Sequence, residues 1–175
     1  MQRLNMMVVS VGTFLDNPSA SIESQAEEFR VRFFHSFLMD GKDELPILIY
    51  ARIMVKGKDD TEQDSIVFAP LYDKAAVRPV IESVLIDGAT WVMQVNEAYR
   101  TEADETGAPI PATRQECLLF ATHTSTWSQV AMHGFKRRGA DLPDPVGGWE
   151  VHDTTEAGSE LGGALLPFQE TEQGN

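Results

Sequence analysis

The sequence predicts an α+β fold: helix, β-hairpin, helix, then an antiparallel meander, forming one mainly antiparallel sheet with the helices packed on one face. Three observations support this class. Apolar residues recur at three- and four-residue steps in segments 21–40 and 73–87. Apolar, β-rich runs fill much of the remaining chain, separated by turn-forming segments rich in Gly, Pro, Asp and Asn. The last of these runs follow one another without an intervening helix.

The first helix is predicted over residues 21–40. Serine at position 21 offers an N-cap oxygen, and glutamates in the early turns suit the positive end of the helix dipole. Phenylalanines dominate the apolar stripe, which predicts an aromatic core beneath this helix. Gly41 follows as a C-cap.

The second helix is predicted over residues 73–87, with Asp73 as its N-cap and Gly88 after its end. Pro79 lacks the backbone N–H that a helix interior needs. Two arrangements resolve the conflict. Either the helix bends at Pro79, or its regular part begins near Arg78 and the proline lies in the first turn.

The predicted strands are an N-terminal apolar segment and six further runs that follow the first helix. An apolar segment, 4–15, forms a strand or an arm that packs on the body or on another subunit. A β-hairpin follows the first helix, with a polar tip at 57–64. The strands expected after the N-terminal segment are 46–56, 65–71, 89–100, 114–124, 127–136 and 148–153.

These elements divide the chain into three parts. Residues 1–20 form the N-terminal arm or strand, 21–153 a single α+β domain, and 154–175 a flexible acidic tail. No Lys or Arg occurs after Arg138, so most of the negative charge comes from the C-terminal fifth. An apolar island at 163–168 (GALLPF) interrupts the tail, and it either packs on the domain, docks on a partner or has no fixed contact.

Composition excludes several classes of function. The 175 residues carry a formal net charge of −13, which opposes non-specific binding to nucleic acid or to anionic membranes and favours cationic partners. The single cysteine, Cys117, permits no internal disulfide, and a reduced cytoplasmic setting suits it. The four histidines lack metal-site spacing, and no phosphate-binding glycine loop is present. We therefore expect neither a metal nor a cofactor.

One strand ends in polar residues that could form a site. In TWVMQVNEAYR (90–100), alternation puts Glu97 and Tyr99 on the face of Trp91, Met93 and Val95. A carboxylate on an apolar face acts as a general acid or base when its pKa is raised, and pairs with a cation otherwise.

An antiparallel pairing of strands 90–100 and 114–124 would bring further charges to the same end of the sheet. Arg100, Arg114 and Tyr99 are the candidate ligand-binding residues there. Glu97, Glu116 and His123 are the candidate catalytic residues if the protein is an enzyme. His123 also lies near Ser125, but the surrounding Ser and Thr residues favour a simple turn, and no nucleophile-elbow motif is present.

Two further groups of residues suit contacts with a partner. The one basic cluster consists of Lys136, Arg137 and Arg138, and we expect it to hold the acidic tail or an acidic surface of a partner. The apolar island contributes Leu165, Leu166 and Phe168.

Three short motifs lie in the middle of the chain: DKAA from Asp73, NEAY from Asn96 and RQE from Arg114. Over residues 46–136 they resemble an uncharacterised group of small bacterial and phage α+β proteins. In that group a D-K-x-A helix start precedes a strand ending S-E-A-W and a strand opening R-E-E. The resemblance implies the order of elements and no activity.

The sequence favours a non-enzymatic interaction or accessory protein of the kind that phages encode. It would bind a protein partner or assemble into a larger particle, as a homodimer through a sheet edge or as part of a larger oligomer. Its location would be the host cytoplasm or the virion. The alternative is a small hydrolase or ligand-binding protein that uses Glu97, Arg100 and Glu116.

Overall fold

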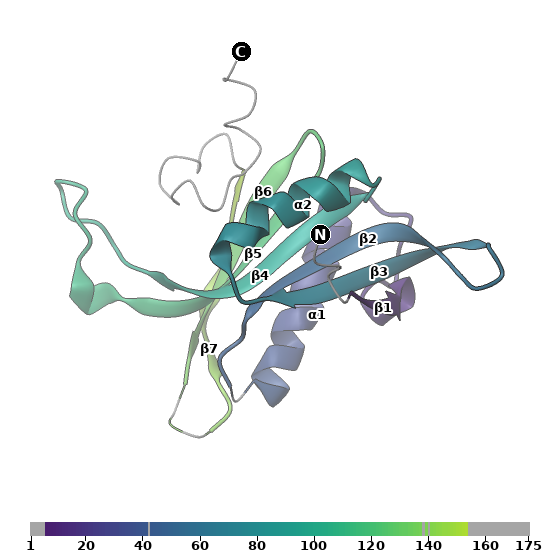
Figure 1. Ribbon diagram of the computed structural model, residues 1–175. Coiled ribbons are helices and arrows are strands. Elements are labelled where there is room, and N and C mark those ends of the chain that lie inside the picture. The colour runs from purple at the N-terminus through teal and green to yellow at the C-terminus, as the bar shows by residue number, and fades with distance from the viewer. Residues whose placement is uncertain (1–5, 42, 138, 140, 154–175) are drawn as a thin grey trace, which may run out of the picture.

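The chain forms one antiparallel sheet of seven strands with a helix on each face (Figure 1). This computed structural model describes residues 6–41, 43–137, 139 and 141–153. The strand order is β1-β3-β2-β4-β5-β6-β7, and every neighbouring pair is antiparallel. The strands are β1 (Met7–Ser10), β2 (Ile47–Lys56), β3 (Glu62–Leu71), β4 (Trp91–Arg100), β5 (Gln115–His123), β6 (Ser128–Lys136) and β7 (Asp144–Asp153). The mainly antiparallel sheet agrees with the predicted fold class.

The first helix, α1 (Ile22–Asp40), packs its aromatic stripe on one face of the sheet. Phe29 is fully buried against Trp91 and Tyr50, with ring centroids 5.7 and 4.9 Å away. Ser21 caps the helix as predicted, because its Oγ accepts a hydrogen bond from the Ser24 N–H. At the other end only glycine suits position 41, since a Cβ there would collide with the Phe37 carbonyl oxygen.

The second helix, α2 (Val77–Ile86), lies on the opposite face (Figure 1). The expectation that both helices share one face is therefore wrong. The reason is visible in β2, where Tyr50 contributes to the core beneath α1 while Ile49 and Ala51 contribute to the core beneath α2. A strand that is apolar at consecutive positions buries both of its faces, and a second helix covers the second face.

The start of α2 settles the problem posed by Pro79. A 3₁₀ turn over Lys74–Ala76 comes first, and the Asp73 side chain accepts a hydrogen bond from the Ala75 N–H (3.0 Å). The α-helix begins at Val77, so Pro79 lies in its first turn, where no intrahelical N–H bond is lost. Of the two arrangements expected, the second is the one adopted.

Two strands are longer than predicted. β3 begins at Glu62 instead of residue 65, because the polar residues before Ser65 continue the ladder with β2. β7 begins at Asp144 instead of residue 148, and Pro145 is tolerated because β7 is an edge strand of the described sheet. A register shift between His133 and Gly134 accommodates this early part.

At the N-terminus, β1 pairs with β3 and is followed by a 3₁₀ turn over Val11–Thr13. Segment 4–15 is therefore a short strand of the sheet over Met7–Ser10. The predicted tail, 154–175, lies outside the described residues. In the part of the chain that is described, no helix is long and apolar enough to cross a membrane.

Packing of α2 on the second face predicts unequal effects for its two isoleucines. Ile81 is fully buried and Ile86 is 84% exposed. Ile81→Ala should lower the free energy of unfolding by about 2–5 kcal/mol, because it leaves a cavity beneath the helix. The matched control Ile86→Ala should change it by less than about 0.5 kcal/mol. Urea unfolding of both variants checks this, and equal effects would contradict the packing of α2.

Candidate functional site

Glu97 lies at the end of β4, on the face that α1 covers. Trp91, Met93 and Val95 precede it on this face and are fully buried in the core under α1. The alternation expected from the sequence is therefore present. The Glu97 side chain itself is 18% exposed.

Arg137 neutralises Glu97. Its guanidinium forms an ion pair with the Glu97 carboxylate, and its Nη1 lies 3.8 Å from Oε1 of Glu116. Its Nη2 also donates a hydrogen bond to the Asp43 carbonyl oxygen (3.0 Å), and the guanidinium carbon lies 5.0 Å from the centroid of the Phe135 ring. Chiefly through the Glu97 hydrogen bond, the pKa of Arg137 is raised above its usual value. Through its contacts with Glu97 and Glu116, Arg137 connects the ends of β4, β5 and β6. The Glu97 carboxylate accepts the hydrogen bond in this ion pair.

Arg100 and Arg114, the two arginines expected at this sheet end, do not join the Glu97 pair. Arg100 lies on the opposite face of β4 and forms an ion pair with Glu150 of β7. Arg114 stacks over the Tyr99 ring at 3.6 Å. β4 and β5 do form the expected hairpin, with Tyr99 opposite Glu116. The charges expected together at this end are nonetheless divided between the two faces, because residues three positions apart in a strand, such as Glu97 and Arg100, point to opposite faces.

His123 lies far from Glu97 along β5, opposite Val92, and is fully buried. Its Nδ1 is 3.1 Å from Oγ of Ser128, whereas Ser125 lies in the exposed turn beyond it. Thr124 organises that turn, since its Oγ1 accepts from the Trp127 N–H (2.9 Å). The structure therefore does not bring His123 together with Glu97 and Glu116.

The predicted interaction residues are distributed as follows. Lys136 is exposed at the end of β6, and Arg137 binds Glu97 of this chain, an acidic group other than the tail that we expected. Arg138 and the island residues Leu165, Leu166 and Phe168 lie outside the described residues.

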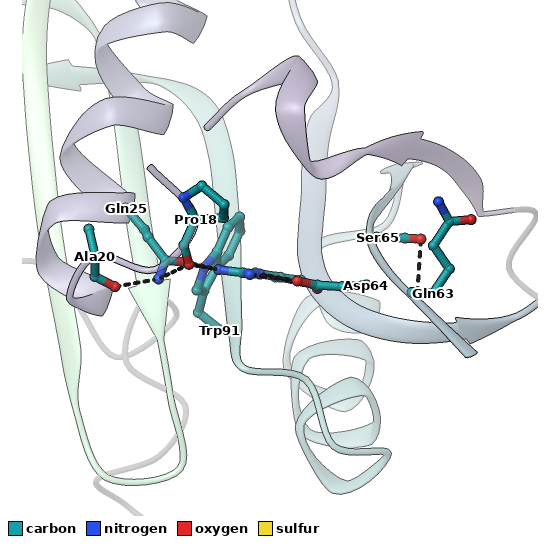
Figure 2. Close-up of polar contacts among 8 residues, drawn as sticks. Pro18, Ala20, Gln25, Gln63, Asp64, Ser65 and Trp91 are labelled. Carbon is teal, nitrogen blue, oxygen red and sulfur yellow. Dashed lines mark hydrogen bonds and ion pairs between the residues drawn. The ribbon is translucent and has the colours of Figure 1, made fainter. Parts of the chain in front are cut away.

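A buried polar network that we did not predict joins α1 to the sheet (Figure 2). The Gln25 Oε1 accepts hydrogen bonds from Trp91 Nε1 (2.9 Å) and Arg52 Nη1 (2.8 Å). Its Nε2 donates to the Ala20 carbonyl oxygen at 2.8 Å. Arg52 Nη1 also donates to the Pro18 carbonyl oxygen at 2.7 Å.

Arg52 completes the network through Asp64 of β3. Its Nε lies 3.2 Å from both carboxylate oxygens, and its Nη2 lies 2.5 Å from Oδ2. The Arg52 side chain is 12% exposed and the Asp64 side chain is 43% exposed, so the guanidinium is largely removed from water while the carboxylate stays partly solvated. Every strong donor and acceptor at its centre is satisfied, which is the pattern of a structural network. The signal in the sequence is an arginine inside the apolar run ILIYARIMV.

A groove of about 700 Å³ opens beside α1. Phe14, Phe33 and Tyr50 line it, with the two phenylalanine centroids 5.6 and 5.9 Å from the Tyr50 ring. Burial raises the pKa of Tyr50 to about 12, so its phenol is neutral. Exposed Val31 and His35 form the helix side of the groove. This aromatic surface could receive an apolar side chain of a partner.

Neither a metal centre nor a known relative indicates the function of this chain. Among the described residues, no group of three His, Cys, Asp or Glu side chains is placed to hold a metal ion. Comparison with protein-family models, curated proteins and solved structures finds no match.

Burial of His123 predicts a pH-dependent stability. Burial lowers the pKa of His123 from 6.5 to about 4, so between these values the unfolded chain binds a proton that the folded chain does not. The free energy of unfolding should be highest above about pH 6.5 and fall by roughly 3 kcal/mol as the pH drops to 4 through this group. His123→Gln should remove that part of the slope in urea unfolding between pH 4 and 8.

His152, which lies on the exposed edge strand β7, provides the matched control. His152→Gln should keep the wild-type slope. The same slope in His123→Gln as in the wild type would contradict a neutral, buried His123.

Proposed function

We propose that this chain is a non-enzymatic interaction protein that binds a protein strand along the outer edge of β7. The observation that carries the proposal is the strand itself. β7 has ten residues, lies at the end of the strand order and, within the described chain, pairs only with β6. An unpaired row of backbone N–H and C=O groups is a template for an added strand.

Only the second half of β7 suits such pairing. Pro145 and the register shift opposite His133 and Gly134 disturb the first half, and features of this kind deter edge pairing. Residues 149–153 continue the regular ladder. Within them Val151 is 42% exposed, which is an apolar contact available to a neighbouring strand.

A second copy of the chain is the partner that this edge favours. An antiparallel pairing of two β7 strands centred on Val151 would set Glu150 of one copy opposite His152 of the other. These side chains share the face opposite Val151, and a carboxylate facing an imidazole complements it by charge or by hydrogen bond. A two-fold contact of this kind closes as a dimer, and the aromatic groove beside α1 offers a separate surface for joining dimers into a larger particle.

The arrangement of charges supports this function over the hydrolase or ligand-binding alternative. Glu97 is paired with Arg137, and Arg100 is paired with Glu150 on the other face. A catalytic acid or base needs a free carboxylate that faces a substrate cavity. Neither Glu97 nor Arg137 lines the groove beside α1, and the separate pocket of about 330 Å³ that Arg100 lines also contains its paired partner Glu150.

Self-association through β7 can be tested with a lysine substitution. Val151→Lys should turn a concentration-dependent dimer into a monomer, because a lysine on an edge strand opposes pairing with another strand. Sedimentation equilibrium between 1 and 200 µM measures this. Ile86→Lys is the matched control, with the same change of charge at an 84% exposed isoleucine on α2, and should dimerise like the wild type. A wild-type chain that is monomeric throughout, or a Val151→Lys variant that dimerises equally, would contradict the proposal.

A further inference from the structure

Arg30 is a buried arginine of α1 that lies over β7. The residue is 8% exposed, and its guanidinium carbon lies 5.5 Å from the centroid of the Trp149 ring. Trp149 faces α1, because its ring also packs against Phe34 of that helix, with centroids 5.5 Å apart. The ring quadrupole of an indole attracts such a cation. The helix therefore holds a positive charge beside the outermost strand of the sheet.

No carboxylate of the described chain binds this arginine. None of the ion pairs there includes Arg30, and its buried Nε has no hydrogen-bond partner. Burial lowers the pKa of Arg30 below its usual value, although Glu27 attracts its charge through space. Arg52 and Arg137, by contrast, each bind a carboxylate of this chain. A largely buried charge is costly without a partner, so a carboxylate supplied from outside would stabilise this position.

The second half of β7 carries one carboxylate on the same face as Arg30. Trp149 and Val151 lie on the α1 face, and alternation along the strand puts Asp153 there as well. Glu150 lies on the other face, where it pairs with Arg100. Asp153 is exposed, and no ion pair of the described chain includes it.

The proposed pairing of two β7 strands, on which this inference rests, brings these two charges together. A two-fold pairing sets each residue opposite one that faces the same side of the combined sheet. With the pair centred on Val151, Trp149 of one copy lies opposite Asp153 of the other, and the symmetry makes this contact twice. Directly opposite residues have Cβ atoms about 5 Å apart, so the carboxylate lies beside the indole that Arg30 covers. Centring the pair on Glu150 would put Val151 there instead.

We propose that Arg30 binds the Asp153 carboxylate of a second copy across the paired β7 edges, and that this ion pair fixes the register of the dimer. One such pair lies at each end of the paired segment, on the α1 face. The contact between Glu150 and His152 lies on the other face. A strand without a carboxylate at this position leaves Arg30 unpaired, which favours a second copy over an unrelated strand.

Substitution of Asp153 tests the ion pair without disturbing the core, because this residue is exposed. Asp153→Asn should raise the Kd of the dimer at least about tenfold in sedimentation equilibrium, since both symmetric ion pairs lose their charge. Asp153→Glu keeps the carboxylate and should give a Kd closer to the wild type than to Asp153→Asn. The matched control is Asp87→Asn, which removes one negative charge at an exposed position after α2 and should dimerise like the wild type.

A double-mutant cycle separates the ion pair from a general effect of charge. Arg30→Gln should weaken the dimer in the same direction as Asp153→Asn. The double variant should be little weaker than either single variant, because each single change already removes the pair. Effects on the dimerisation free energy that simply add would overturn the proposal. Circular dichroism checks that each variant is folded.

The outcomes distinguish this ion pair from the β7 interface itself. A dimer that Val151→Lys abolishes and Asp153→Asn leaves unchanged would overturn the ion pair while the interface stands. A wild-type chain that stays monomeric would overturn both. If Arg30→Gln does not fold, the Asp153 variants decide alone, and equal Kd values for Asp153→Asn and Asp87→Asn would overturn the proposal.

Discussion

The Gln25 side chain connects α1 to the sheet, and much of the fold is arranged around it. One amide binds the Trp91 indole, the Arg52 guanidinium and the turn before the helix. These groups come from α1, β2 and β4, and Asp64 extends the network to β3 (Figure 2). Because the amide is 4% exposed, removing a partner would leave polar atoms without hydrogen bonds in the interior. The network therefore fixes the start of α1 over the sheet.

The rest of the core follows from a sheet that is buried on both faces. With α1 fixed, its phenylalanines form the layer over Tyr50, Trp91 and Phe120. The opposite face of β2 and of the start of β4 is also apolar and receives α2. Besides Arg52 within β2, the sheet carries two ion pairs near the end of β4, where Glu97 meets Arg137 and Arg100 meets Glu150. These ion pairs join β4 to the segment after β6 and to β7, and the outer edge of β7 is the surface that we propose for a partner.

Local patterns in the sequence predicted the elements well, and contacts between distant residues were out of reach. The phenylalanine stripe of α1, the two possible arrangements at Pro79 and the alternation of β4 each depend on neighbours within a few residues. The partner of Glu97, Arg137, lies forty residues away, and the sequence alone predicted only that a cation would pair with this carboxylate if it was not an acid or base. The two helices were assigned to one face because helical periodicity does not say which side of a sheet a helix covers. The polar start of β3 was not predicted for a related reason. Asp64 belongs to the strand because it pairs with Arg52, which lies twelve residues away in the chain.

A double-mutant cycle between Gln25 and Arg52 tests most directly whether the network holds α1 to the sheet. Gln25→Met and Arg52→Met keep side chains of similar length and remove the hydrogen bond between Oε1 and Nη1. Urea unfolding of the wild type, both single variants and the double variant gives their coupling free energy. The account predicts a favourable coupling of about 1–3 kcal/mol, as expected for partners in one buried network. A coupling within about 0.3 kcal/mol of zero would show that the two residues act independently and would contradict it.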